Sequence, residues 1–157
     1  MDAPKISVVI PNYNYEQFLP ERLESILNQS YLPSEIIFLD DKSTDASVVT
    51  ARRILKKQAE DHQIPFKIIR NRKNKGVYQQ WLKGIKEAQY DWVWIAEADD
   101  SSAVNFLEKL CSRITPNTCL VYSQSKKIDE HSDEITPNNL AHTDDISQIK
   151  WLSLIHI

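Results

Sequence analysis

Glycine is almost absent from this sequence. Its 157 residues include only two glycines, Gly76 and Gly84, whereas an average protein contains about 7% glycine. A dinucleotide-binding fingerprint and a phosphate-binding loop each need several glycines in close register. Because no glycine precedes Gly76, any nucleotide that this chain binds is not held by a glycine-rich loop.

Cysteines, surplus positive charge and long apolar runs are also lacking. Cys111 and Cys119 are too few and too far apart for a zinc ribbon or a disulfide framework, so we expect two reduced thiols. The net charge of −3, from 19 basic and 22 acidic residues, argues against a nucleic-acid-binding protein. No apolar run is long enough to span a bilayer, and residues 1–4 do not begin a signal peptide. The length and the 41% hydrophobic content suit one soluble domain.

Short apolar runs alternate with amphipathic stretches along the chain. The runs are rich in β-branched and aromatic residues, which predicts strands at residues 6–10, 36–39, 66–69, 92–96 and 119–122. Their continuous apolarity is typical of a parallel sheet buried on both faces.

Apolar residues at three- and four-residue spacing predict helices between these strands, at residues 18–27, 48–55, 77–85 and 106–114. The alternation predicts an α/β fold with a mostly parallel sheet covered by helices. Residues 124–148 are polar, and we expect a loop there with a short strand near Ile128. Trp81, Trp92 and Trp94 are expected in the core.

In open α/β sheets, ligands bind beyond the carboxyl ends of the strands. The segments that follow the first four predicted strands are therefore the candidate site, and they are residues 11–15, 40–45, 70–76 and 97–100. Together they bring aromatic rings, amides, carboxylates and cations to one edge of the sheet. These groups suit a base, a ribose, a metal ion and a diphosphate.

Three carboxylates gather at the fourth of these ends, on Glu97, Asp99 and Asp100. They repel one another unless a cation lies between them, and Mg²⁺ or Mn²⁺ prefers oxygen ligands. The alternative is a solvated acidic turn that caps a helix beginning near Ser102.

The other segments also allow two interpretations. Asp40 and Asp41 could accept hydrogen bonds from a base or a ribose, or residues 43–45 could simply cap the next helix. Tyr13 and Tyr15 could stack on a base, or they could be half-buried surface tyrosines. The cations of residues 67–75 could meet phosphates or lie in a solvated loop.

Four motifs resemble those of a known family. Residues 6–14, ISVVIPNYN, resemble the opening strand of the family 2 glycosyltransferases, which have the GT-A fold. Residues 40–45, DDKSTD, resemble that family's D-D-x-S-x-D segment, and residues 74–76, NKG, resemble its N-x-G before the third helix. Residues 97–100, EADD, stand where the family has its D-x-D metal motif. The resemblance covers roughly residues 5–125.

The resemblance implies an α/β fold of the GT-A type, a three-layer sandwich with a mostly parallel central sheet, whose C-terminal part is missing here. It implies transfer of a sugar from a nucleotide-diphosphate sugar to an acceptor hydroxyl, with inversion and of the hexosyltransferase type, as in polysaccharide biosynthesis. The expected donor is a UDP-, GDP- or dTDP-sugar, and the expected cofactor is Mn²⁺ or Mg²⁺. The acceptor, a carbohydrate, lipid or protein, is not indicated.

The resemblance also assigns residues. The metal ligands are Asp99 and Asp100. Glu97 replaces the first Asp of the D-x-D pattern and, being one methylene longer, reaches differently, to the ribose or through water. The nucleotide-sugar site comprises Pro11, Tyr13, Asn14, Asp40, Asp41, Asn74, Gly76, Glu97 and Asp99, with Pro11, Tyr13 and Asp40 on the side of the base and ribose.

No residue is assigned as the catalytic base. In this family the base is a carboxylate, typically in an E-D pair well downstream of the metal motif, and nothing after Asp100 resembles it. We therefore expect residues 1–125 to be a nucleotide-sugar-binding domain and residues 126–157 to begin the acceptor side, with the base in the missing C-terminal part. Residues 152–157 resemble a translated sequencing adaptor, the alternative being the start of an amphipathic helix.

The expected location is the cytoplasm, with the full-length protein at the inner face of the membrane through its missing part. Two alternatives to a transferase are considered. A truncated, catalytically inert module would bind only a nucleotide or a partner. A nucleotidyltransferase would want a glycine-rich basic loop after the first strand, and residues 11–14 are nothing like one.

Overall fold

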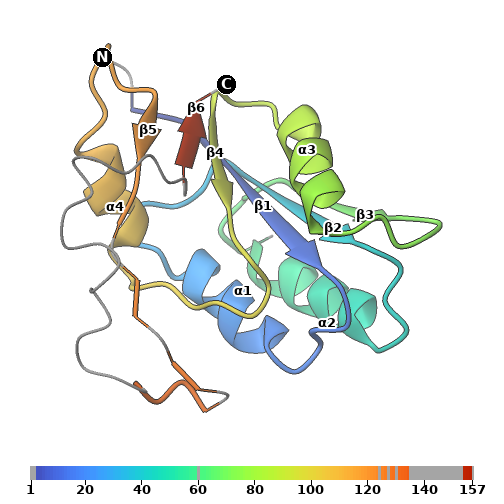
Figure 1. Cartoon of the computed structure of the whole chain (residues 1–157). Helices are drawn as coiled ribbons and strands as arrows, with labels where there is room; N and C mark the ends of the chain where they lie inside the picture. Colours follow the sequence, from blue (N-terminus) through green and yellow to red (C-terminus); the bar gives the residue numbers. More distant parts are fainter. Residues whose placement is uncertain are drawn as a thin grey trace.

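A computed structural model describes residues 3–59, 61–123, 125–126, 128–129, 131–134 and 154–156 of the chain. Within them the strands form one sheet in the order β3-β2-β1-β4-β6-β5 (Figure 1). The parallel strands are β1 (Ile6–Asn12), β2 (Glu35–Asp40), β3 (Phe66–Arg70) and β4 (Trp92–Ile95). The antiparallel strands are β5 (Leu120–Val121) and β6 (Leu154–His156). The predicted α/β fold with a mostly parallel sheet is therefore confirmed.

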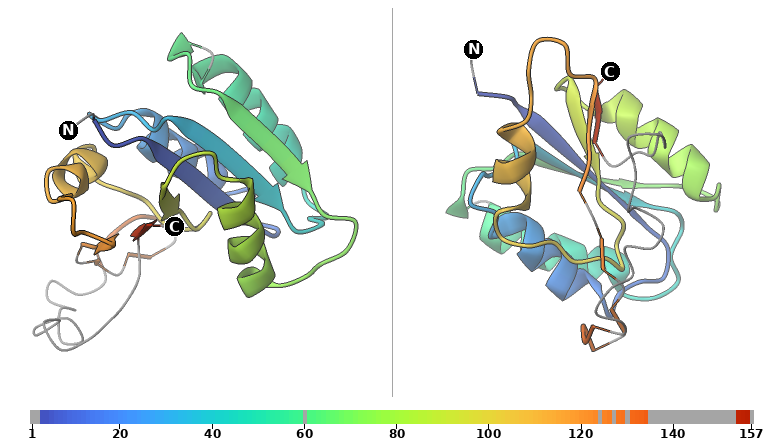
Figure 2. Two further views of the ribbon diagram at one scale, coloured as in Figure 1. Left: turned by 90° about the horizontal axis from the view of Figure 1, so that it is seen from above. Right: turned by 60° about the vertical axis from the view of Figure 1, so that its left-hand side comes forward.

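Helices cover both faces of the sheet. They are α1 (Leu19–Leu27), α2 (Ser47–Ile54), α3 (Val77–Glu87) and α4 (Phe106–Cys111), and α2 continues into the π-helical turn η1 (Leu55–Ala59). Figure 2 shows α3 on one side of the sheet, opposite α1 and α2. No helix among the described residues is long and apolar enough to cross a membrane.

Strand alternation divides the core into two layers. Ile6, Val8 and Ile10 of β1 belong to a large cluster with the apolar stripe of α1, which begins at Leu19. The intervening Val9 faces the opposite way, in a smaller cluster beneath α3. Both faces are apolar, as the continuous apolar runs predict.

Several local predictions need correction. Trp92 and Trp94 are buried, but Trp81 is only half-buried, so its predicted place in the core is wrong. Leu154–His156 form a strand, so a helix in this segment is also wrong. The strand expected near Ile128 is a single antiparallel bridge to Glu134, and most of the polar loop predicted around it lies outside the described residues.

Gly84 brings α3 directly onto the sheet. A Cβ at this position would lie 2.2 Å from Cγ1 of Val9 and 3.2 Å from Cδ1 of Leu39. The first distance is far shorter than van der Waals contact and the second is tight, so only glycine allows the helix to pack this closely on the sheet. The position of α3 decides where its side chains meet the carboxyl edge of the sheet.

We predict that Gly84→Ala destabilises the fold. Overpacking a tight core costs about 1–3 kcal/mol, which outweighs the roughly 1 kcal/mol that alanine gains over glycine in a helix. Urea denaturation should show a lower midpoint for this variant. Lys86→Ala, on the exposed side of the same helix, is the control, and a stabilised Gly84→Ala variant would contradict the close packing.

Candidate functional site

A pocket of about 560 Å³ lies at the carboxyl edge of the parallel strands. Most residues predicted for the site line it, namely Pro11, Tyr13, Asp41, Asn74, Gly76, Glu97 and Asp99. Asn12 and Tyr15, which lie in the candidate segment 11–15, also line the pocket, whereas the lining residues Val77, Gln80 and Trp81 were not predicted. Asn14, Asp40 and Asp100 are not among the lining residues.

Asp40 is fully buried and holds neighbouring segments together. Its Oδ2 accepts a hydrogen bond from the Ser43 backbone N–H at 3.1 Å and lies 3.2 Å from Nε of Arg70. Its Oδ1 accepts from Nδ2 of Asn12 at 3.2 Å. Each oxygen of this carboxylate is thus used within the protein.

Asn14 joins the loops after β1 and β2. Its backbone adopts a positive φ of 58°. Its side-chain oxygen accepts from the Thr44 N–H at 2.8 Å, and its own N–H donates to Oγ of Ser43 at 2.9 Å. Asn14 does not line the pocket itself, but it connects the two loops beside it.

The structure gives different outcomes for the two segments that could cap a helix, residues 43–45 and residues 97–100. Oδ1 of Asp45 accepts a hydrogen bond from the Ser47 N–H at 3.0 Å, at the first residue of α2. Residues 97–100 cap no helix near Ser102, because the next helix begins only at Phe106. The alternative interpretation of residues 97–100, an acidic turn that caps a helix, is therefore wrong.

Asp41 anchors the start of α3. Its Oδ2 accepts hydrogen bonds from the N–H groups of Lys75 and Gly76, each at 2.8 Å. Its Oδ1 accepts from Nδ2 of Asn71 at 2.7 Å. Gly76 has a positive φ of 83°, and α3 begins at the next residue, Val77.

Trp81 and Glu97 meet across the pocket. The indole Nε1–H of Trp81 donates to Oε1 of Glu97 at 2.5 Å. Burial raises the pKa of Glu97, the hydrogen bond from Trp81 lowers it, and the charges of Asp99 and Asp100 raise it again, with a net increase. Glu97 is thus a half-buried carboxyl group held by a neutral donor.

Tyr15 approaches the acidic segment from the other side. The charge of Asp99 raises the pKa of the Tyr15 hydroxyl, as do partial burial and a hydrogen bond between the two side chains. Tyr13, by contrast, is 45% exposed at the rim. Of the two tyrosines, Tyr15 therefore contacts an acid and Tyr13 keeps a ring free for a ligand.

A buried cation lies beneath the acidic segment. Arg22 of α1 is 2% exposed, its Nη1 donates to Oγ of Ser102 at 2.8 Å, and its guanidinium lies 5.0 Å from the ring centre of Trp94. Burial lowers the pKa of Arg22 to about 10, against the charges of Asp100, Glu97 and Asp99. Burial likewise raises the pKa of Asp100, while Arg22 opposes the increase.

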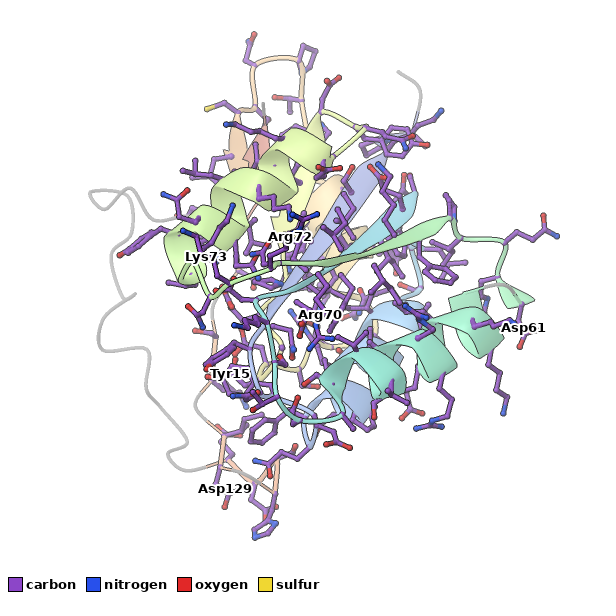
Figure 3. All side chains as sticks on the ribbon, turned by 90° about the vertical axis from the view of Figure 1, so that its right-hand side faces the viewer. Tyr15, Asp61, Arg70, Arg72, Lys73 and Asp129 are labelled. Atoms are coloured by element: carbon purple, nitrogen blue, oxygen red, sulfur yellow. The ribbon has the colours of Figure 1, made fainter. Side chains whose placement is uncertain are left out.

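The cationic stretch after β3 is only partly available to a ligand. Arg70 is engaged by Asp40 and donates to the Ser43 carbonyl at 2.8 Å. Arg72 and Lys73 are exposed on the turn that leads into α3 (Figure 3). These two side chains carry positive charge on the α3 side of the pocket.

With this geometry in place, the comparison with known proteins is decisive. The model of the family described as glycosyl transferase family 2 matches residues 7–155. The chain belongs to this family.

Two relatives illustrate the similarity. A putative glycosyltransferase, EpsE of Bacillus subtilis (strain 168), is 38% identical over 107 residues, which are 68% of this chain and 37% of EpsE. The cholesterol galactosyltransferase of Borreliella burgdorferi is 33% identical over 121 residues, 76% of this chain and 32% of that protein. The chain thus spans about a third of the length of these family members.

Solved structures of glycosyltransferases share the fold. The mannosyltransferase PcManGT from Pyrobaculum calidifontis, in complex with GDP-Man and Mn²⁺, superposes with a TM-score of 0.64 at 24% identity over 74% of this chain and 34% of that one. TarS from S. aureus, in complex with UDP, gives a TM-score of 0.58 at 26% identity over 69% of this chain and 31% of that one. The fold is that of the GT-A glycosyltransferases, as expected.

Three pocket-lining residues that the sequence analysis did not predict belong to α3. Val77, Gln80 and Trp81 have helical spacing directly after Gly76, so the stripe that predicts the helix also contains its pocket-lining face. Arg22 has a clearer signal, because it interrupts the otherwise apolar stripe between Leu19 and Leu23 of α1. A charged residue on a buried stripe indicates a special environment.

We predict that Asp41→Asn loosens the start of α3. An amide places an N–H₂ group against N–H donors, and an unsatisfied buried donor costs about 1–3 kcal/mol. Denaturation should show this loss, and hydrogen exchange at Lys75 and Gly76 should become faster. Asp61→Asn, an exposed acid (Figure 3), should change neither quantity, and unchanged exchange in Asp41→Asn would refute the anchor.

Proposed function

We propose that this chain binds the donor in a glycosyltransferase that transfers a hexose from a nucleotide-diphosphate sugar to an acceptor hydroxyl. The observation that carries the proposal is the pocket, where an exposed ring, Tyr13, and the acids Glu97 and Asp99 meet at the carboxyl edge of the sheet. Membership of glycosyl transferase family 2 and the UDP complex of TarS support it.

The nucleoside would occupy the side of the pocket formed by Pro11, Tyr13 and the start of α3. Tyr13 offers an aromatic face to the base. Asp41 acts mainly by holding the backbone of Lys75 and Gly76 in place, because its oxygens are taken by N–H groups. Asp40 and Asn14 would act without contacting the nucleotide, by fixing the loops after β1 and β2.

The acidic segment has the donor chemistry for a divalent cation, although the described residues form no preassembled cluster of three or more metal-binding side chains. Glu97, Asp99 and Asp100 supply only oxygen donors, the chemistry that Mn²⁺ and Mg²⁺ prefer. Burial and, to a smaller extent, the charge of Asp99 raise the pKa values of Glu97 and Asp100. Asp99 and Asp100 would hold the ion. When bound, it would neutralise the charge that develops on the leaving nucleoside diphosphate. PcManGT, of the same fold, was solved with GDP-Man and Mn²⁺.

Inversion requires the acceptor hydroxyl to attack from the face opposite the diphosphate, with a base within reach of its proton. We assign no described residue to this role. The chain spans about a third of the length of these relatives, and we propose that the base lies outside the described residues. This observation also favours the second candidate, a donor-binding module without transferase activity of its own.

We expect metal-dependent binding of a nucleoside diphosphate. Calorimetry with UDP, GDP and dTDP, each with and without Mn²⁺, should give a Kd for at least one nucleotide that tightens with the metal. If a folded sample binds none of them, the proposal is wrong. Release of free sugar or sugar transfer from the matching donor separates the two candidates, because turnover by this chain excludes the inert module.

Asp99→Ala should remove the metal dependence of nucleotide binding. The expected result is a Kd with Mn²⁺ that rises to the value measured without it, because a carboxylate that lines the pocket no longer holds the ion. Asp91→Ala, an exposed acid before β4, should behave as the unchanged chain. A metal-dependent Kd that survives in Asp99→Ala would exclude this residue as a ligand.

A further inference from the structure

The place of Trp81 is fixed by three contacts between α3 and the sheet with its adjoining loop. Gly84 sets the helix against Val9, and Asp41 holds its first turn. Between them, Gln80 is buried and its Nε2 donates to the carbonyl of Leu39 at 3.1 Å. The side chain of Trp81, the next residue, therefore extends from α3 at a fixed distance from the sheet.

The ring of Trp81 is also held. Tyr78 packs edge-on against it, with 5.4 Å between ring centres and 77° between ring planes. An indole N–H can only donate, and it finds its acceptor in Oε1 of Glu97 at 2.5 Å. Among the described residues, no hydrogen-bond donor is found for the second oxygen, Oε2.

We propose that Trp81 is the positioning residue for Glu97, and that the two side chains act as one unit in nucleotide binding. The inference rests on the proposed function. The indole takes one carboxylate oxygen and so directs the other, Oε2, toward the nucleotide. Neither residue then has its full effect without the other.

The length of Glu97 is essential to this unit. Aspartate would restore the D-x-D pattern of the family, but it is shorter by one methylene, about 1.5 Å of reach. Its oxygens would withdraw from an indole that Gly84, Asp41 and Tyr78 keep in place. Glu97→Asp is therefore harmful in this chain, although it restores the family pattern.

The test is a double-mutant cycle on nucleotide affinity. UDP and GDP are titrated in the presence of Mn²⁺ into Glu97→Asp, Trp81→Phe and the double variant, with circular dichroism to confirm the fold of each. Each single change should raise the Kd about tenfold, the loss of one hydrogen bond to a charged group. The double variant should also lose about tenfold rather than a hundredfold. Glu24→Asp, an exposed change on α1, is the matched control.

A second measurement does not depend on nucleotide. In ¹⁵N-correlated NMR spectra, Trp81→Phe identifies the indole signal, which should lie downfield through its bond to the carboxylate. Glu97→Asp should move it upfield, whereas Glu97→Gln, which keeps the length and an acceptor oxygen, should move it less. The remaining indole signals should stay in place.

The outcomes decide between the possibilities. Coupled losses with the indole shift support the unit. Additive losses, or a Glu97→Asp variant that binds as tightly as the unchanged chain, overturn it. If the unchanged chain binds no nucleotide, the proposed function and the role of the unit in nucleotide binding both fail. The NMR shift of Trp81 in Glu97→Asp then decides separately whether Trp81 positions Glu97, and an unchanged shift overturns that as well.

Discussion

The carboxylate of Asp41 connects the two halves of the pocket. It stands at the end of β2 and accepts hydrogen bonds from the backbone that opens α3, at Lys75 and Gly76. These N–H groups precede the helix and have no partner within it. Without the carboxylate, the N–H groups of Lys75 and Gly76 would need water or another acceptor. The pocket wall formed by Val77 and Trp81 would then no longer be fixed in position relative to the sheet.

Charge in the site is arranged in layers. The acids Glu97 and Asp99 face the pocket, and the guanidinium of Arg22 lies beneath them in the core. Arg22 binds Ser102, a few residues beyond the acids, rather than forming an ion pair with them. It therefore offsets part of the repulsion at the strand end while the carboxylates remain open to solvent and to a ligand.

The sequence predicts the scaffold well because β-branched runs and helical stripes report burial directly. It also predicts which edge of the sheet carries the site, since the polar segments follow the strands. It cannot tell Asp40 from Asp41. Adjacent residues on a strand point to opposite faces, so one faces α1 and α2 and the other the pocket, and only the register of β2 decides which.

Trp81 and Trp94 show the same limit for apolar residues. Both lie in apolar patterns, and the sequence assigns both to the core. Trp94 lies under α4, against Phe106, whereas Trp81 lies in the N-terminal half of α3 and lines the pocket at the carboxyl edge. Whether a helical residue is buried or reaches the pocket depends on how closely the helix packs on the sheet. For α3 this close packing depends on a single glycine, Gly84.

The order of the strands has a consequence for how such a site can change. From β1 the chain moves outward to β2 and β3, then returns to place β4 on the other side of β1. This is a topological switch point, where the loops on either side of β1 part and leave a crevice. The crevice exists before any side chain fills it, so substitutions in the flanking loops can alter the ligand while the apolar packing of the sheet stays the same.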